Sequence, residues 1–317
     1  MSVPGEFDLI RRYFTPSFLP AHIILGVGDD CAILQIPAGH QLAVSIDTQV
    51  VNVHFHADTD PALLASRVLR CAASDLAAMG AEPLGFTLAL TLPAVDESWL
   101  EKFSTGLLQT AKALSCPLIG GDTTRGPLCI SIQVHGSVPT GKAIKRSGAQ
   151  IGDQVWVSGS LGDGAAALAY MEQRLEVTPI TANYLSHRFY QPDIDFLMSV
   201  QLRDVASSCI DVSDGLLADL GHICEASGVG ARIYLGQLPV AAEWSDIVGA
   251  GQKWQWVLSG GDDYRLCFTA SIDRREQLLA MGGVYCIGEI VVGNAVQVLD
   301  ESGAIYTKNP DSGFRHF

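Results

Sequence analysis

Aspartates recur in this sequence beside glycines and at the expected ends of strands, where carboxylates could bind a metal ion. The first pair, Asp29 and Asp30, follows Gly26 and Gly28 in the stretch LGVGDDCAIL. A single aspartate usually caps a helix or closes a turn. Asp75 does not fit that explanation, because it lies inside an Ala- and Leu-rich helical stretch, where aspartate has low propensity and no end to cap. The pattern continues along the chain at Asp47, Asp122, Asp211 and Asp214.

Such a set of carboxylates is typical of a site for Mg²⁺. Carboxylates that converge repel one another unless divalent cations bind between them. Mg²⁺ takes oxygen ligands, and it commonly binds through one or two carboxylates together with the phosphates of a substrate. The neighbouring glycines leave the backbone open to a phosphate group. The sequence therefore predicts a Mg²⁺-dependent site for a phosphate-bearing substrate.

Two other phosphate- or metal-binding motifs fit the sequence poorly. GSVPTGKA (136–143) has the glycine and lysine spacing of a P-loop, but Ala143 occupies the place of the Mg²⁺-binding Ser or Thr. Gly148 and Gly152 would also interrupt the helix that should follow. DVSDGLLADLGH (211–222) has glycine at its fifth position and no glutamate at its twelfth, so it is not an EF-hand calcium loop.

Length and charge limit the class of protein. A chain of 317 residues indicates two domains. There are 34 acidic and 20 basic residues, and the net charge of −14 argues against a nucleic-acid partner. ATP would also be repelled unless cations accompanied it. The eight cysteines form no C-x-x-C pair, and no segment resembles a signal peptide or a membrane span. We therefore expect reduced thiols, no membrane association and a cytoplasmic location.

Hydrophobic periodicity predicts the elements that must position the aspartates. In the N-terminal half, helices are expected at 5–14, 60–81 and 96–114, and strands at 31–36, 41–47, 85–92 and 127–138. In the C-terminal half, we expect a helix at 162–174, a strand–turn–helix unit at 209–228, and strands at 154–159, 230–236, 264–270 and 284–290. Neighbouring strands occur as well as strands that alternate with helices, so the predicted fold is α+β. Its two domains are 1–140 and 141–317, with the glycine-rich segment 140–153 as their boundary.

Eight motifs occur in a specific order: GVGDDCAIL, SIDTQVVNVHF, ASDLAAMGAEP, LIGGDTTRGP, RSGAQIGD, DVSDGL, LSGGDDY and SGFRHF. Together they resemble the motifs of the thiamine-monophosphate kinase family, which belongs to the superfamily of aminoimidazole ribonucleotide synthetase and selenophosphate synthetase. The resemblance runs along nearly the whole chain, and GGDTTRGP and SDLAAMGA are its most specific parts. It implies transfer of the γ-phosphoryl group of ATP to thiamine phosphate, with several Mg²⁺ ions. A requirement for K⁺ is left open.

The resemblance also implies an architecture. The N-terminal domain would bind ATP and Mg²⁺, and its mixed or antiparallel sheet would pair with a second copy in a homodimer. The C-terminal domain would be an α+β sandwich-like domain that completes the active site.

Roles for single residues follow from the matching motif positions. The implied catalytic residues are Asp47, Asp122 and Arg146. The implied ATP contacts are Gly121, Asp122, Arg146 and Ser213, and the implied substrate contacts are His54, Asp262 and Phe314. The implied Mg²⁺ ligands are Asp30, Ser45, Ile46, Asp47, Asp75, Asp122, Asp211 and Asp214.

Departures from the family pattern affect two of these positions. Ile46 replaces a threonine, so it offers a metal only its backbone carbonyl. Asp262 replaces a glutamate and is one methylene shorter in its reach toward the substrate.

Other members of the superfamily, and a binding protein without catalysis, are alternatives to the kinase. Selenophosphate synthetase chemistry is disfavoured because no lysine accompanies Cys31, and a hydrogenase-maturation carbamoyl dehydratase would end in cysteine rather than RHF. An aminoimidazole ribonucleotide synthetase-like activity and a non-catalytic nucleotide or divalent-cation sensor both stay open on the sequence alone.

Overall fold

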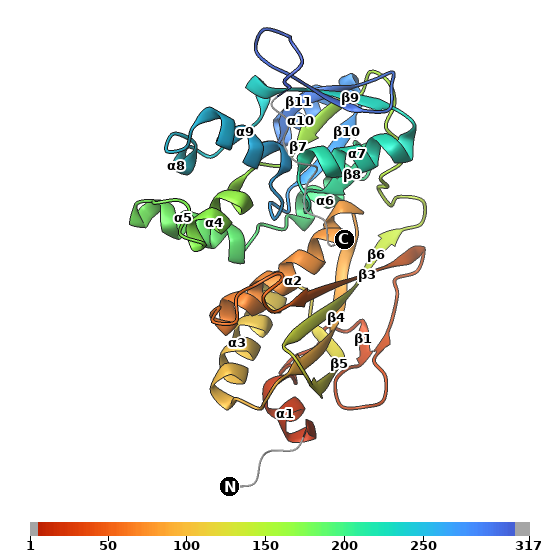
Figure 1. The fold of residues 1–317 in the computed structure, drawn as a ribbon. Helices are drawn as coiled ribbons and strands as arrows, with labels where there is room; N and C mark the ends of the chain where they lie inside the picture. The colour runs from red at the N-terminus through yellow and green to blue at the C-terminus, as the bar shows by residue number, and fades with distance from the viewer. Residues whose placement is uncertain (1–5, 308–317) are drawn as a thin grey trace. The chain divides into compact units, whose positions relative to one another are not determined.

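The computed structural model describes residues 6–307, and the chain divides into two compact units (Figure 1). Unit 1 consists of Met1–Leu76 and Ala81–Gly141, and unit 2 consists of Ala77–Gly80 and Lys142–Phe317. Phe314, a predicted substrate contact, lies outside the described residues. No helix among residues 6–307 is both long enough and apolar enough to cross a membrane.

Unit 1 is built on a four-stranded mixed sheet in the order β3-β6-β4-β5. Only the β4–β5 pair is parallel, and β6 pairs antiparallel with both β3 and β4. A separate two-stranded sheet is formed by β1 and β2. The strands of unit 1 are β1 (Ile23–Leu25), β2 (Ile33–Leu34), β3 (His40–Val50), β4 (Glu82–Leu92), β5 (Leu118–Arg125) and β6 (Cys129–Pro139).

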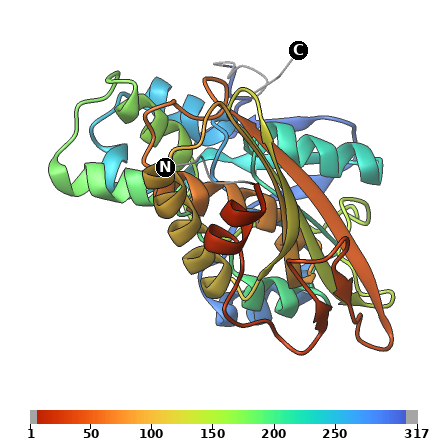
Figure 2. The same cartoon turned by 90° about the horizontal axis from the view of Figure 1, so that it is seen from below.

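Helices cover one face of this sheet. Along β6, Ile132 and Val134 are buried, whereas Gln133 and His135 on the other face are half-buried. This alternation is that of a strand with one face in the core. We call the two sides the covered face and the open face. The helices on the covered face are α2 (Pro61–Ala78) and α3 (Glu97–Ala113), and a short helix, α1 (Glu6–Tyr13), precedes β1 (Figures 1 and 2).

Unit 2 contains a six-stranded sheet in the order β12-β9-β11-β7-β10-β8, in which only the β12–β9 pair is parallel. Both of its faces are buried, because Val155 and Val157 belong to one apolar core and Trp156 between them belongs to another. Its strands are β7 (Gln154–Val157), β8 (Ser208–Asp211), β9 (Gly230–Tyr234), β10 (Leu266–Ala270), β11 (Tyr285–Val291) and β12 (Val296–Leu299). Its α-helices are α4 (Asp163–Met171), α5 (Pro179–Tyr190), α6 (Phe196–Leu202), α7 (Leu216–Ser227), α8 (Ala242–Ser245), α9 (Ala250–Ser259) and α10 (Arg275–Met281).

The structure has the expected α+β character in both units, with differences in detail. No element is predicted at LIGGDTTR, yet these residues form β5. The two glycines explain the omission, since glycine is depleted in strands. The expectation that Asp47 ends a strand is wrong, because β3 continues to Val50. Asp122, predicted only as an aspartate beside glycines, lies inside β5.

Candidate active site

Ser45, Asp47 and Asp75 form an acidic cluster in unit 1. Ser45 and Asp47 alternate along β3 and point to the covered face, where α2 carries Asp75. The Ser45 hydroxyl donates a hydrogen bond to Asp75 Oδ2 at 2.5 Å. Burial, and then the charge of Asp75, raise the pKa of Asp47, while a hydrogen bond from Gln49 acts in the opposite direction. The fold therefore holds two carboxylates close enough to repel each other.

This donor set fits a divalent cation. Two carboxylates and a hydroxyl supply hard oxygen ligands, and a cation beside them would remove the repulsion that raises the pKa of Asp47. Among residues 6–307, no group of three or more His, Cys, Asp and Glu side chains could hold a metal ion by itself. A cation in the acidic cluster would therefore complete its coordination with water, backbone carbonyls or substrate oxygens, as Mg²⁺ commonly does.

His54 lies in the turn that follows β3. Its backbone N–H donates to the Val50 carbonyl at 3.0 Å, and its ring Nδ1 accepts the Val50 N–H at 3.1 Å. Because Nδ1 is the acceptor, the neutral ring carries its proton on Nε2. The imidazole is half-buried, and its Nδ1 atom is fixed by the backbone.

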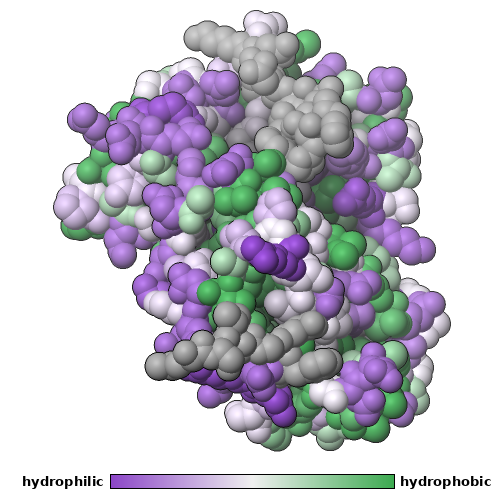
Figure 3. Space-filling view, turned by 60° about the horizontal axis from the view of Figure 1, so that its bottom comes forward, coloured by the Kyte–Doolittle hydropathy of each residue, from purple (hydrophilic) through white to green (hydrophobic). Residues whose placement is uncertain are grey.

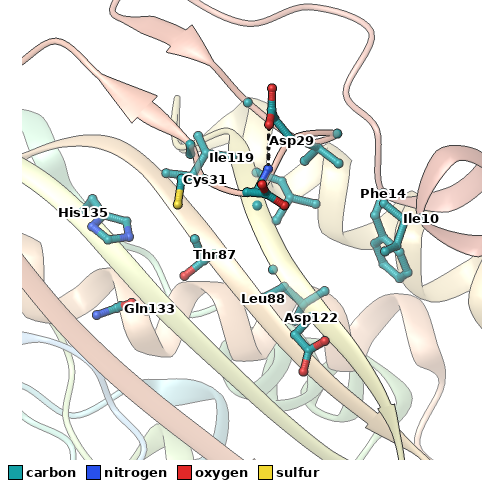
Figure 4. A pocket seen from close by; sticks show the side chains of 18 of the residues that line it. Ile10, Phe14, Asp29, Cys31, Thr87, Leu88, Ile119, Asp122, Gln133 and His135 are labelled. Atoms are coloured by element: carbon teal, nitrogen blue, oxygen red, sulfur yellow. Dashed lines mark hydrogen bonds between the residues drawn. The ribbon is translucent and has the colours of Figure 1, made fainter. Parts of the chain in front are cut away.

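A pocket of about 630 Å³ opens in unit 1 beneath the glycine-rich loop that carries Asp29 and Asp30 (Figure 4). In this loop, Asp29 Oδ1 accepts the Asp30 N–H at 2.8 Å. His135 lies on the open face of β6, so the pocket is on the side of the sheet that α2 and α3 leave uncovered. The residues that line it include Phe14, Gly26, Val27, Gly28, Cys31, Thr87, Gly120, Gly121, Asp122 and Gln133.

Gly121 and Asp122 lie side by side in β5 but serve different structural purposes. A Cβ atom at Gly121 would lie 2.0 Å from the Leu88 carbonyl oxygen, so only glycine allows this approach of β5 to β4. Asp122 in β5 is paired with Ala89 in β4. Asp47 in β3 and Leu88 in β4 are both paired with Ile132 in β6, so these two side chains lie on the same face of the sheet. The side chains of Asp122 and Asp47 therefore point to opposite faces of the sheet. The expected gathering of both carboxylates at one point is not seen in this unit.

In unit 2, Asp211 ends β8, and Ser213 and Asp214 form the turn before α7. Asp219, which carries no motif signal of its own, lies in the first turn of α7. Its Oδ2 accepts the backbone N–H groups of Ser213, Asp214 and Gly215 at 3.0, 3.0 and 3.1 Å. This one oxygen therefore sets the shape of the turn that carries the predicted ATP and Mg²⁺ residues. The only sequence signal is an aspartate in the first helical turn, which is common at helix starts.

The Asp219→Asn variant should change how stability depends on pH. Burial, and then the charges of Asp211 and Asp214, raise the pKa of Asp219 from 3.8 to about 7. Between these values the folded protein keeps a proton that the unfolded chain has released, so the free energy of unfolding falls as the pH rises. The variant keeps an oxygen acceptor but lacks this titration. Urea unfolding in EDTA should show wild type losing a few kcal/mol relative to the variant across this range. A constant difference would contradict the assignment.

The remaining predicted residues of unit 2 lie in two loops. Arg146 is exposed, and its carbonyl accepts a hydrogen bond from the Ser227 hydroxyl at 3.3 Å. Asp262 lies in the loop before β10, and its N–H donates to the Ser213 carbonyl at 2.9 Å. The structure thus brings Asp262, a predicted substrate contact, next to the turn that carries Ser213 and Asp214.

Comparisons with known proteins agree with these motifs. The family model described as "AIR synthase related protein, N-terminal domain" matches residues 28–138, and the one described as "AIR synthase related protein, C-terminal domain" matches residues 150–300. Over 293 residues, the chain is 50% identical to the thiamine-monophosphate kinase of Escherichia coli strain K12 and 49% identical to that of Salmonella typhimurium strain LT2. Each alignment covers 90% of both chains.

Solved structures are similar as well. The thiamine-monophosphate kinase of Stenotrophomonas maltophilia K279a superposes with a TM-score of 0.83 at 41% identity, covering 88% of this chain and 91% of that one. A structure described as AaThiL complexed with AMPPCP and TMP superposes with a TM-score of 0.80 at 27% identity, covering 89% of each chain. The two family domains, the extent of the identity and the shared fold all agree. This chain therefore belongs to the thiamine-monophosphate kinase family of AIR synthase related proteins.

Proposed function

We propose that this protein transfers the γ-phosphoryl group of ATP to thiamine phosphate, giving thiamine diphosphate and ADP. The observation that carries the proposal is its 50% identity, over 90% of both chains, to a thiamine-monophosphate kinase. A structure of similar fold complexed with AMPPCP and TMP supports the same pair of ligands. The sensor and the aminoimidazole ribonucleotide synthetase-like activity have no comparable support among the relatives described above.

Several Mg²⁺ ions are part of this proposal. Bound Mg²⁺ would hold the phosphates of ATP and neutralise the charge of the transferring phosphoryl group. The acidic cluster of Ser45, Asp47 and Asp75 supports the assignment, because its carboxylates repel each other without a cation. The Ile46 side chain points to the open face and is 63% exposed, so only its carbonyl would be a ligand. The other proposed ligands are Asp30, Asp122, Asp211 and Asp214.

The other residues bind and orient the two substrates. Phosphoryl transfer depends on position and charge neutralisation more than on covalent assistance. Gly121, Asp122 and Ser213 would contact ATP. Arg146 would pair its positive charge with the ATP phosphates. His54, whose Nδ1 is held by the Val50 N–H, and Asp262 would contact the thiamine phosphate. In-line attack by a phosphate oxygen of thiamine phosphate on the γ-phosphorus then needs no phosphoenzyme.

The direct test is ³¹P NMR of the purified protein with Mg-ATP, with and without thiamine phosphate. We expect the pyrophosphate signals of thiamine diphosphate to appear together with ADP, and only when both substrates are present. EDTA should stop the reaction, and replacing K⁺ by Na⁺ in the same assay tests the monovalent cation. ATP that stays intact with thiamine phosphate and Mg²⁺ present would refute the proposal.

We also propose a homodimer formed through the sheet of unit 1. β3 is an edge strand, and Leu42, Val44 and Ile46 on its open face are 49%, 47% and 63% exposed. Figure 3 shows one face of the molecule, on which apolar side chains reach the surface among hydrophilic ones. Exposed edge strands with apolar side chains are typical pairing surfaces. Sedimentation analysis should give twice the mass of the chain.

A cytoplasmic location is proposed as well. The eight cysteines are all free thiols, and five of them are buried. Unpaired, buried thiols are typical of proteins from a reducing compartment.

A further inference from the structure

The loop 260–264 of unit 2 contains two residues with left-handed backbone. Asp262 has φ of 68° and Tyr264 has φ of 50°. Residues with a Cβ atom rarely adopt this conformation, and they keep it only where the surroundings hold it in place. Asp262 is also the residue assigned to the substrate. The contacts that fix this loop therefore bear on substrate binding.

Backbone hydrogen bonds hold one side of the loop. The N–H of Asp262 donates to the Ser213 carbonyl at 2.9 Å, and the N–H of Tyr264 donates to the Val212 carbonyl at 2.8 Å. The Tyr264 hydroxyl donates to Asp262 Oδ1 at 3.2 Å, which directs the carboxylate itself. A Cβ atom at Gly261 would lie 2.3 Å from the Ser213 carbonyl oxygen, so the two segments are in close backbone contact.

Asp263 holds the other side. It is 2% exposed, and its carboxylate bridges two backbone groups at the start of α4. Oδ2 accepts the Gly162 N–H at 2.7 Å, and Oδ1 accepts the Gly164 N–H at 3.0 Å. The first N–H groups of a helix lack partners within the helix, and a carboxylate there is favoured by the helix dipole. A Cβ atom at Gly164 would lie 2.4 Å from the Gly261 carbonyl oxygen, so there is no room for the loop to move closer.

The start of α4 is itself held rigidly. Asp163 is 1% exposed, and its Oδ1 accepts the indole N–H of Trp244 in α8 at 2.8 Å. Its Oδ2 accepts hydrogen bonds from the Ser160 hydroxyl at 2.6 Å and, from α5, the Tyr184 hydroxyl at 2.8 Å and Arg188 Nε at 3.0 Å. Three helices thus meet at Asp163. A buried hydrogen-bond network of this kind has little freedom to rearrange.

We propose that Asp263 is a positioning residue: by bridging the loop 260–264 to the start of α4, it holds the neighbouring Asp262 in the orientation that binds thiamine phosphate. The inference rests on the proposed function, since it concerns the substrate side of that reaction. Asp263 is buried and is not itself a substrate contact. Its two oxygens determine where the loop lies, and the left-handed backbone of Asp262 determines where its side chain points.

The test is the Asp263→Asn variant. Burial, and then the charge of Asp163, raise the pKa of Asp263 to about 7, so a neutral side chain is compatible with this site. The amide keeps one acceptor oxygen, but its NH₂ group cannot accept the second N–H. We expect the KM for thiamine phosphate to rise about tenfold, as for loss of one charge-assisted hydrogen bond, with kcat and the KM for ATP little changed.

A matched control comes from the same unit. Asp300 Oδ1 also accepts two backbone N–H groups, of Ser302 and Ala304, but in an exposed turn between β12 and the chain end. Asp300→Asn should leave the KM for thiamine phosphate unchanged. An equal rise of the KM for thiamine phosphate in both variants would refute a specific role for Asp263.

A double-mutant cycle separates positioning from general damage. If Asp263 acts through Asp262, then Asp263→Asn should have no further effect on the KM in an Asp262→Ala background. Additive effects, or an unchanged KM in the single variant, would overturn the proposal.

Amide hydrogen exchange gives a readout that does not depend on turnover. Asp263→Asn should speed exchange at Gly162 or Gly164 and at Asp262 and Tyr264, with the rest of unit 2 unaffected. Unchanged exchange at Asp262 would also overturn the proposal. Absence of kinase activity in wild type would instead refute the proposed function, and exchange alone would then decide whether Asp263 holds the loop.

Discussion

The Asp47→Asn variant should lose phosphoryl transfer without losing stability. As a proposed Mg²⁺ ligand, the carboxylate contributes to several kcal/mol of transition-state stabilisation, so we expect kcat to fall by about a thousandfold. The free energy of unfolding of the protein without metal should rise or stay constant. Burial and the charge of Asp75 raise the pKa of Asp47, which means that its negative charge is unfavourable in the folded protein without metal. Removing that charge at neutral pH relieves the repulsion.

The two effects are measured separately. Steady-state kinetics with Mg-ATP and thiamine phosphate gives kcat, and thermal unfolding in EDTA gives the midpoint. Asp58→Asn is the control, because this substitution also removes one negative charge from unit 1. Asp58 is exposed in the loop that follows β3. It should leave both quantities at the wild-type value. A wild-type kcat in the Asp47→Asn variant would refute the assignment of Asp47 as a Mg²⁺ ligand.

The Gly121→Ala variant should be both less stable and less active than wild type. Its Cβ atom would lie 2.0 Å from the Leu88 carbonyl oxygen and 2.9 Å from the Leu88 carbonyl carbon, and backbone atoms inside a sheet cannot move aside alone. β5 would have to separate locally from β4. We expect the free energy of unfolding to fall by about 3 kcal/mol, as for overpacked sites. Displacement of Asp122, the next residue, should also reduce kcat/KM for ATP by at least about tenfold.

The neighbouring glycine provides the control. A Cβ atom at Gly120 would meet only the Thr87 Cγ2 atom, at 3.8 Å, which is ordinary van der Waals contact. Gly120→Ala should therefore fold and turn over nearly as wild type does. Urea unfolding and ATP kinetics of the two alanine variants test this contrast. Equal behaviour of both variants would show that the approach of β5 to β4 does not require glycine at position 121.

Much of the architecture could be predicted from local patterns. The helices α2 and α3 and the strands β4 and β6 follow from the spacing of their apolar residues, because burial of one face imposes a period of 3.6 or 2. The strand β5 could not be predicted this way. Gly120 and Gly121 have no side chain to show a period, and the strand forms because glycine allows close contact with β4.

Contacts between distant residues depended on the tertiary structure. Asp47 and Asp75 are 28 positions apart (75 − 47), and nothing local indicates that they meet. They meet because α2 packs on the covered face of β3, where the Ser45 hydroxyl reaches Asp75. Asp122 shows the opposite outcome. Its register with Ala89 puts it on the open face, and a shift of one residue would reverse that.

The sequence by itself determined the residue types, the order of the motifs and hence the family, and from these we predict a Mg²⁺-dependent chemistry. Only the tertiary structure revealed the roles of Asp219 and Asp263, since an aspartate near a turn looks the same in the sequence whether it is exposed or buried. Asp219 accepts backbone N–H groups from the turn that carries Ser213 and Asp214. Asp263 accepts them from the start of α4, next to the loop that carries Asp262. The physical reason is range: apolar periodicity acts over a few residues, whereas hydrogen-bond partners and faces are settled by packing between elements far apart in the chain.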